Sequence, residues 1–248
     1  MAAAAKKLVL ITGANSGIGF ELAAQLMSKG TYHVFLGARS PEKGNAALKD
    51  LQSRNLPGSA EFIHIDATDD KTISNAASSV KDSHGKLDIL VNNAAVAVVP
   101  GSSRQQLNTS FDTNATGPWV IGETFLPLLK NSTSPSRRVI NISSGAGSIN
   151  RRLDSSSPIY KMQEVQYRAS KAALNMVTAC QFVEFGEFGI KVFAYDPGFT
   201  VSNLGPYNTK EKGARSAEES VRPLVDVLEG KRDDEAGRFL HNTGDYPW

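Results

Sequence analysis

A tyrosine and a lysine stand four residues apart in the stretch "VQYRASKAALN" (165–175). If this stretch is helical, Tyr167 and Lys171 lie on the same face, because side chains four apart are neighbours on a helix. A phenol titrates at about pH 10, and a neighbouring ammonium favours the phenolate and lowers the phenol's pKa. The pair could therefore exchange a proton with a substrate oxygen near neutral pH. A chance pairing on a surface helix is the plain alternative.

Two further observations narrow the possible proton donor and its helper. Tyr160 is a poorer acid than Tyr167, because Glu164 follows it by four residues and a carboxylate raises a phenol's pKa. A hydroxyl that could polarise a substrate oxygen is offered by "NISSG". Neighbours on a strand point to opposite faces, so only one of Ser143 and Ser144 can face a pocket.

The stretch "TGANSGIG" (12–19) lies between a strand-like run and a helix-like segment. Its three glycines permit a tight turn and a close approach to a pyrophosphate, and the following helix would offer free N–H groups to that anion. We therefore predict dinucleotide binding, the alternative being a turn that merely needs glycines. The next strand ends at Arg39, a planar cation that suits a 2′-phosphate. No carboxylate occurs between Thr31 and Pro41 to hold a ribose diol, so NADPH is favoured over NADH.

The elements that must position these residues alternate along the chain. Short apolar runs at 7–12, 33–38, 61–66, 87–93, 138–143, 190–196 and 237–242 predict strands, and periodic segments at 17–29, 41–54, 70–84, 110–130, 165–187 and 217–230 predict helices. This alternation predicts one doubly wound α/β domain over 1–248, with a parallel sheet covered on both faces. Three segments fit neither class, and each follows a strand at the edge where such sheets bind ligands: 94–109, 145–164 and 198–216.

The composition agrees with a soluble globular protein. The chain has 248 residues, of which 40% are hydrophobic, and a formal net charge of +2 without a long basic block. Neither nucleic-acid nor membrane binding is indicated. One cysteine, Cys180, and an opening "MAAAAKK" that is too short for a signal peptide predict a cytoplasmic protein. Since the histidines show no metal-binding spacing, no metal site is predicted: His33, His64, His84 and His241.

Five short motifs occur in one order along the chain. They are "TGANSGIG", "NNAA" (92–95), "NISS" (141–144), "YRASK" (167–171) and "DPG" (196–198). Together they resemble the short-chain dehydrogenase/reductase family over essentially the whole chain, and within it the NADPH-dependent carbonyl-reductase branch. The resemblance implies a Rossmann-like fold with a seven-stranded parallel sheet. It also implies reversible reduction of a ketone or aldehyde to an alcohol by direct hydride transfer.

The resemblance further implies roles for individual residues. Ser144 polarises the substrate oxygen, with Ser143 as the structural alternative, while Tyr167 and Lys171 act on the proton. Asn114 kinks its helix and supports the proton path. The residues implied in cofactor binding are Gly13, Asn15, Ser16, Gly17, Ile18, Gly19, Arg39, Asp66, Ala67, Asn93, Ala94, Ala95, Tyr167, Lys171, Pro197, Gly198, Thr200 and Ser202. Asp66 has an alternative reading as a helix N-cap, and Asn92 is expected to steady the central strand.

Some alternatives stay open at this level. An NAD-linked alcohol dehydrogenase would differ in cofactor choice, and a non-catalytic NADP-sensing protein would bind without turnover. The stretch "NRRLDSSSPI" (150–159) is polar and predicts a flexible surface loop. It is either a harmless insertion or one wall of a small-molecule pocket opposite a lid at 199–216, with Arg151, Arg152 and Tyr160 selecting the substrate. A homodimer is possible.

Overall fold

The computed structural model describes residues 6–248, so most of the "MAAAAKK" stretch lies outside it. One eight-stranded sheet runs through the molecule in the order β3-β2-β1-β4-β5-β6-β7-β8. The strands are β1 (Lys7–Ile11), β2 (Tyr32–Ala38), β3 (Ser59–His64), β4 (Ile89–Asn92), β5 (Arg138–Ile142), β6 (Lys191–Asp196), β7 (Phe239–His241) and β8 (Gly244–Tyr246). The predicted seven parallel strands are confirmed. An additional strand, β8, pairs antiparallel with β7 and was missed because its three residues are too few to show a period.

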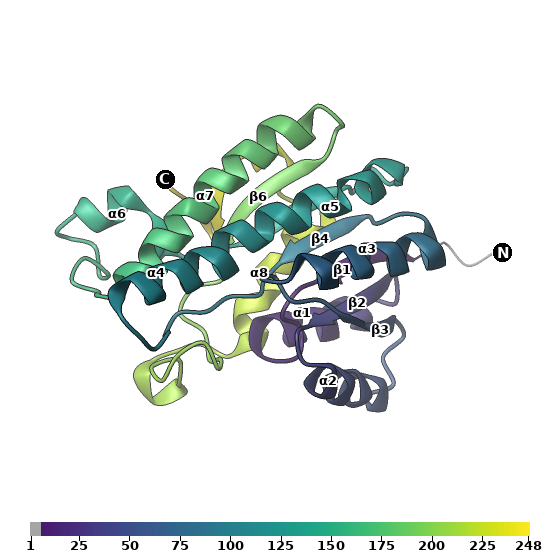
Figure 1. The fold of residues 1–248 in the computed structure, drawn as a ribbon, viewed down its shortest axis with the longest axis horizontal. Helices are drawn as coiled ribbons and strands as arrows, with labels where there is room; N and C mark the ends of the chain where they lie inside the picture. The colour runs from purple at the N-terminus through teal and green to yellow at the C-terminus, as the bar shows by residue number, and fades with distance from the viewer. Residues whose placement is uncertain (1–5) are drawn as a thin grey trace.

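Helices cover both faces of this sheet (Figure 1). They are α1 (Gly17–Ser28), α2 (Pro41–Ser53), α3 (Asp70–His84), α4 (Ser103–Phe111), α5 (Gly117–Asn131), α6 (Ile149–Leu153), α7 (Val165–Gly186) and α8 (Ala217–Glu229). Helices α1, α2 and α8 share one apolar core with Val9 and Ile11 of β1. Helices α3, α5 and α7 lie next to one another on the other face, and α3 and α5 share the second core with Leu8 and Leu10. Because both faces of β1 are buried, its sequence is continuously apolar.

Two segments predicted as loops contain helices. Helix α4 begins at Ser103, inside 94–109, because Ser102 and Gln105 form a capping box that the sequence analysis overlooked. Helix α6 lies inside 145–164, and the side chain of Ser148 caps it by accepting from the N–H of Arg151. The prediction of a flexible loop over 150–159 is therefore wrong for its first four residues. The single helix predicted at 110–130 is also divided, by a π-helical turn at Asp112–Thr116.

A buried chain of amides joins the middle of the sheet to α7. The register places Asn92 of β4 beside Asn141 of β5, and the Asn92 Nδ2 donates to the Asn141 Oδ1 at 2.8 Å. The Asn141 Nδ2 in turn donates to the Thr178 Oγ1 at 2.9 Å and to the Gln181 Oε1 at 2.8 Å, both on α7. Buried amides need such partners. This network confirms that Asn92 steadies the central strand, and it fixes the height of α7 above the sheet.

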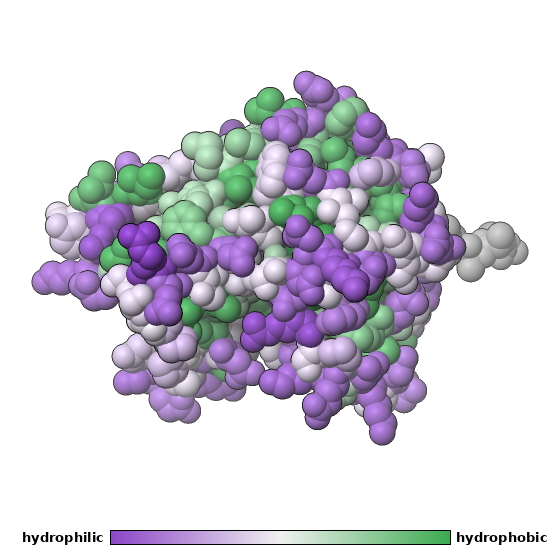
Figure 2. All heavy atoms as spheres, viewed as in Figure 1, coloured by the Kyte–Doolittle hydropathy of each residue, from purple (hydrophilic) through white to green (hydrophobic). Residues whose placement is uncertain are grey.

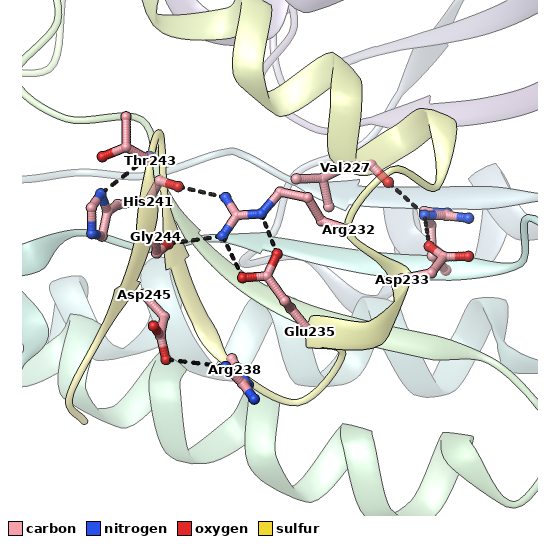
Figure 3. Close-up of polar contacts among 10 residues, drawn as sticks. Val227, Arg232, Asp233, Glu235, Arg238, His241, Thr243, Gly244 and Asp245 are labelled. Atoms are coloured by element: carbon pink, nitrogen blue, oxygen red, sulfur yellow. Dashed lines mark hydrogen bonds and ion pairs between the residues drawn. The ribbon is translucent and has the colours of Figure 1, made fainter.

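The C-terminal hairpin is held by one arginine (Figure 3). Arg232, which follows α8, donates from Nη1 to the carbonyl oxygen of His241 at 2.6 Å and from Nη2 to that of Gly244 at 2.9 Å. Its guanidinium also pairs with Glu235. A planar donor fork suits two carbonyls and a carboxylate at once. The hairpin of β7 and β8 is thereby fixed beside β6.

The outer surface of α6 and α7 is unusually apolar. Figure 2 shows hydrophobic side chains gathered over these two helices. The residues concerned are all more than half exposed: Ile149, Leu153, Val165, Met176 and Val183. Among residues 6–248, every helix is too short or too polar to span a lipid bilayer.

Candidate active site

The glycine turn after β1 uses backbone shapes that favour glycine. Gly13 and Gly17 have φ values of 63° and 56°, in the left-handed region. A Cβ on Gly13 would lie 2.9 Å from the Cα of Ala94, and one on Gly19 would lie 2.6 Å from the Nδ2 of Asn93. The first glycine therefore makes the turn, and the last lets α1 approach the segment after β4.

The segment after β4 is bonded directly to this turn. The Oγ1 of Thr12 accepts from the backbone N–H groups of Asn93 and Ala94, each at 3.0 Å. The Nδ2 of Asn93 donates to the carbonyl oxygens of Thr12 and Gly13, at 2.9 and 3.1 Å. The motifs at 12–19 and 92–95 are thus hydrogen-bonded into one surface at the carboxyl edge of the sheet.

The N-terminus of α1 is free to bind an anion. Ser16 stands at its N-cap, but the Ser16 side chain makes no capping hydrogen bond, and the first turn holds no acidic residue. Five other α-helices have side-chain caps at their N-termini, from Ser40, Asp69, Ser102, Ser148 and Ser216. The first N–H groups of α1 have no intrahelical partner and form the positive end of the helix dipole. A dinucleotide pyrophosphate fits this donor set.

The residues predicted for the adenosine side lie at the ends of β2 and β3. Arg39 is exposed, and its carbonyl oxygen lies 3.1 Å from the Nε2 of His64. The Asp66 Oδ1 accepts from the N–H and Oγ1 of Thr68, at 3.0 and 2.9 Å. Asp69 rather than Asp66 caps α3, so the N-cap reading of Asp66 is wrong. The other predicted contacts lie in the turns after β1, β3, β4 and β6, or in the first turn of α1: Asn15, Ile18, Ala67, Ala95 and Pro197.

Helix α7 carries the predicted proton donor towards the end of β5. Tyr167 and Lys171 are 7% and 2% exposed, and the Lys171 Nζ lies 5.9 Å from the centre of the Tyr167 ring. That ammonium donates to the carbonyl oxygen of Ile142 at 2.7 Å. Ser144 lies close enough to Tyr167 to lower the phenol's pKa, whereas Ser143 turns inward and donates to the Oδ1 of Asn175 at 2.6 Å. The structure therefore brings Ser144, Tyr167 and Lys171 together and places Ser143 in the core.

The two titrating groups behave differently from the sequence-based expectation. Burial raises the pKa of Tyr167, and the Ser144 contact offsets only part of this. Burial lowers the pKa of Lys171 to about 7, against a weaker opposing effect of Asp196. Desolvation disfavours both charged forms, and a partly neutral lysine exerts little field on the phenol. From the protein's own groups, Tyr167 keeps its proton at neutral pH, so the expected lowering of its pKa is not found.

A buried carboxylate, for which the sequence predicted no role, acts on the charge of Lys171. Asp196 ends β6, is 7% exposed and accepts from the N–H of Gly198 at 2.8 Å. The backbone N–H of Gly145 also bonds to it, and its charge favours the protonated form of Lys171. The motif "DPG" contributed to the family resemblance and to the predicted cofactor contacts at Pro197 and Gly198, but no role was predicted for the Asp196 carboxylate. An acidic residue at the end of a fully buried strand is itself a signal, because carboxylates are seldom buried without partners.

The predicted asparagine lies in the π-helical turn, as a helix kink requires. Asn114 is fully buried, and its Nδ2 donates to the carbonyl oxygen of Val96 at 2.7 Å and to the Ser170 Oγ at 2.9 Å. Its Oδ1 accepts from the N–H of Val96 at 2.8 Å. Single π-turns inside helices often occur at functional sites. The side chain thus links the segment after β4 to Ser170 of α7, the residue before Lys171.

The segment 198–216 folds over the glycine turn. The Cβ of Ser202 lies 3.3 Å from the position that a Cβ on Gly17 would take. Thr200 is buried, and its hydroxyl bonds to the carbonyl oxygen of Gly198 and to the Oγ of Ser220, at 2.9 and 2.8 Å. The Thr200 hydroxyl is thus engaged within the protein, while Ser202 lies nearer the glycine turn.

The chain end forms part of the rim on the other side, which the sequence did not predict. The Oγ of Ser148 donates to the carbonyl oxygen of Pro247 at 2.6 Å. The Arg151 guanidinium lies 4.1 Å from the centre of the Tyr246 ring. Arg152 donates to backbone carbonyls within its own segment, that of Met162 at 3.0 Å among them. Both arginines thus hold the shape of 145–164, and a direct role in substrate selection stays a prediction.

Comparison with known proteins agrees with this geometry. The family model described as short chain dehydrogenase matches residues 7–213. The short-chain dehydrogenase anuI of Penicillium roqueforti is 41% identical over 91% of this chain and 89% of its own length. The short-chain dehydrogenase/reductase tropE of Talaromyces stipitatus is 35% identical, over 97% of each chain. The structure of an NADPH-bound carbonyl reductase from chicken fatty liver superposes with a TM-score of 0.85 at 29% identity, over 98% of this chain and all of that one.

Proposed function

Because the chain belongs to the short-chain dehydrogenase/reductase family, on its carbonyl-reductase-like side, we propose that it reduces a ketone or aldehyde with NADPH. Membership makes it an oxidoreductase. The observation that carries the finer proposal is the placement of Ser144, Tyr167 and Lys171 together, beside an uncapped helix N-terminus at the same sheet edge. Catalysis and anion binding are thus available at one place.

The cofactor would be held by groups already on this edge. The N–H groups of the first turn of α1 would bind its pyrophosphate, and Arg39 would pair with a 2′-phosphate. The name of the chicken neighbour states that it binds NADPH, which supports the same choice here. Lys171 would donate to the nicotinamide ribose. When bound, NADPH supplies the hydride.

Each residue of the catalytic group would act on the carbonyl oxygen. The hydroxyl of Ser144 donates a hydrogen bond that stabilises the charge developing on that oxygen. The phenol of Tyr167 gives it a proton as the carbon is reduced. Since burial raises the pKa of Tyr167, the phenol holds its proton at neutral pH and suits the reductive direction. The phenolate left on Tyr167 would then regain a proton from Lys171, which takes one up from solvent, and the negative charge of Asp196 favours the protonated lysine.

The substrate would enter between the two flanking segments. On one side 198–216 covers the glycine turn, and on the other 145–164 is held by the chain end through Ser148 and Pro247. Exposed Phe199 and Tyr207 on the first segment offer apolar contact to a hydrophobic carbonyl compound.

A homodimer through α7 is part of the proposal. Val165, Met176 and Val183 are exposed and are spaced by whole turns, so they lie on one face of α7. Light scattering behind a sizing column would report twice the chain's mass. A mass of one chain at micromolar concentration would contradict pairing.

The activity is tested by a panel of ketones, aldehydes and quinones, each mixed with enzyme and NADPH or NADH. We expect loss of NADPH absorbance with part of the panel, and slower loss of NADH. Turnover with NADH alone would instead support the NAD-linked alternative. Tight NADPH binding without turnover on any compound would support the sensing alternative.

A further inference from the structure

The amino-terminal edge of the sheet, opposite the active site, carries two histidines and a glutamate. His33 is the second residue of β2, Glu61 lies in β3, and His84 is the last residue of α3. The register pairs His33 with Ser59 and Phe35 with Glu61, so alternation puts His33 and Glu61 on the face that α3 covers. One nitrogen or oxygen from each of the three side chains lies within 4.8 Å of the other two.

The spacing of these atoms is that of a metal's ligands. The Oε1 of Glu61 lies 3.4 Å from the Nε2 of His33 and 3.5 Å from the Nε2 of His84. Around a tetrahedral Zn²⁺ with bonds of about 2.0–2.2 Å, two ligand atoms lie about 3.3–3.6 Å apart. The same distances would also fit an ion pair, so the hydrogen bonds must decide between them.

The nitrogen of His33 that faces the cluster makes no hydrogen bond to any of the residues 6–248, although it is buried. Its other ring nitrogen, Nδ1, lies 2.8 Å from the Oγ of Ser59. A plain histidine–glutamate pair would direct the inner N–H at the carboxylate, and here the 3.4 Å contact lacks the geometry of a hydrogen bond. Metal-binding histidines instead hold one nitrogen with an outer partner and direct the other at the ion. Ser59 supplies such a partner.

The surrounding charges favour a cation. His84 ends α3, and Gly85 follows in the left-handed conformation, so the negative end of the helix dipole lies at the cluster. Glu61 adds a carboxylate. Lys6 and Lys86 line the same hollow. Neither ammonium bonds to a ligand atom.

Both lysines have other partners that offset their effect. The Nζ of Lys86 lies 3.1 Å from Asp88, and that of Lys6 donates to the Oγ of Ser59 at 3.3 Å.

Aromatic packing holds the two imidazoles in place. The buried ring of Phe35 meets that of His33 edge-on at 5.0 Å and that of His84 edge-on at 5.3 Å, measured between ring centres. The side chains of His84 and Glu61 are 30% and 47% exposed, which leaves solvent access for a water as a fourth ligand. Three protein ligands and a water are a common zinc set.

We propose that His33, Glu61 and His84 bind a divalent transition-metal ion, with Zn²⁺ as the ion that two imidazoles and one carboxylate suit best. Because β3 is the outermost strand of the sheet, the ion would link this strand to β2 and to the end of α3. It lies at the opposite edge from Tyr167, so it has no part in hydride transfer. Its effect is on the stability of the sheet edge.

The test is calorimetric titration of Zn²⁺ into the tag-free chain carrying Cys180→Ser, since Cys180 is an exposed thiol that could bind zinc itself. We expect one Zn²⁺ per chain, and a loss of affinity of about tenfold or more in His84→Gln. His64→Gln is the matched control, because His64 is an exposed histidine on the same strand as Glu61 and lies outside the cluster. It should bind zinc like the parent.

Thermal unfolding and Co²⁺ absorption test the same site independently. At free zinc one hundred times the Kd, the parent should unfold about 5–10 °C higher, and His84→Gln should not respond. Co²⁺ in the parent should give the intense visible bands of a tetrahedral site, and Zn²⁺ should displace them. No zinc binding in the parent, equal binding in His84→Gln, or a Co²⁺ spectrum of the free aqueous ion would overturn the proposal.

Discussion

The two edges of the sheet present opposite ends of helix dipoles, although the same strands and helices build both. At the carboxyl edge, α1 begins with uncapped N–H groups beside a glycine turn. At the amino edge, α3 ends on His84 beside Glu61. In a parallel sheet with helical crossovers, helices begin at one edge and end at the other. Their dipoles therefore make the first edge suited to anions and the second to cations.

The comparison also separates chemistry from stability. The carboxyl edge buries titrating groups whose charged forms are disfavoured, as the lowered pKa of Lys171 shows. Such arrangements cost folding free energy and are typical of active sites. The amino edge gathers half-exposed groups that could gain from an added cation. Changes at the first edge should thus affect turnover, and changes at the second should affect metal-dependent unfolding.

The largest expected effect is that of Tyr167→Phe, which keeps the ring and removes the proton. The rate of carbonyl reduction should fall about 10²–10⁴-fold, as is usual for loss of a positioned general acid. Fluorescence titration should show NADPH affinity near that of the parent, and zinc affinity should not change. Retention of more than half of the turnover would remove Tyr167 from the mechanism.

A smaller effect should distinguish two neighbouring serines at the same edge. Ser144→Ala removes a donor to the developing oxyanion and should lower kcat about 10²–10³-fold. Ser143→Ala removes only the internal bond to Asn175, so it should lower the free energy of unfolding by about 1 kcal/mol and leave kcat nearly unchanged. Steady-state rates and urea unfolding of both variants are the measurements. The reverse order of effects on kcat would show that the wrong serine faces the substrate.

Arg39→Asp tests whether the carboxyl edge also binds the 2′-phosphate of NADPH. Loss of a charge-assisted bond to the 2′-phosphate should weaken NADPH binding about 10- to 150-fold. NADH, which has no such phosphate, should bind as well as before or better. Dissociation constants for both cofactors decide this. Equal affinities of the parent for NADPH and NADH would contradict the assignment.

The smallest effect concerns the stability cost of the buried lysine. The pKa of Lys171 in the folded chain, about 7, is below its ordinary value of 10.5. Between these values the unfolded chain binds more protons, so this group makes the chain more stable as pH rises from about 7. Lys171→Met should remove about 1–2 kcal/mol of that rise between about pH 6 and pH 8. Parallel pH profiles for parent and variant in urea unfolding would contradict the burial argument.

Much of the carboxyl edge could be predicted because its residues are encoded locally. The glycine turn, the pair Tyr167 and Lys171, and the adjacent serines Ser143 and Ser144 are each contained in a short stretch of sequence. The strands were predictable too, since burial on both faces leaves a continuous apolar run. The effect of Asp196 on Lys171 and the return of the chain end to Ser148 were not predictable, because they depend on which segments meet in space.

The amino edge shows why other features escaped prediction. His33, Glu61 and His84 are far apart in sequence and converge only through the register of β2 with β3 and the length of α3. The direction of the Tyr167 pKa shift was missed for a related reason. Spacing shows which groups are neighbours, but the depth of burial decides how strongly each charge is disfavoured.

The most direct test of the account follows the hydride itself. NADPH deuterated at the reactive C4 position should be incubated with the enzyme and a carbonyl compound from the panel that is turned over, and the alcohol should be analysed by mass spectrometry. Direct transfer to the substrate carbon predicts one deuterium in the alcohol, bound to the former carbonyl carbon, with turnover lost in Tyr167→Phe. Consumption of NADPH that yields an alcohol without deuterium, or no alcohol at all, would contradict carbonyl reduction at this site.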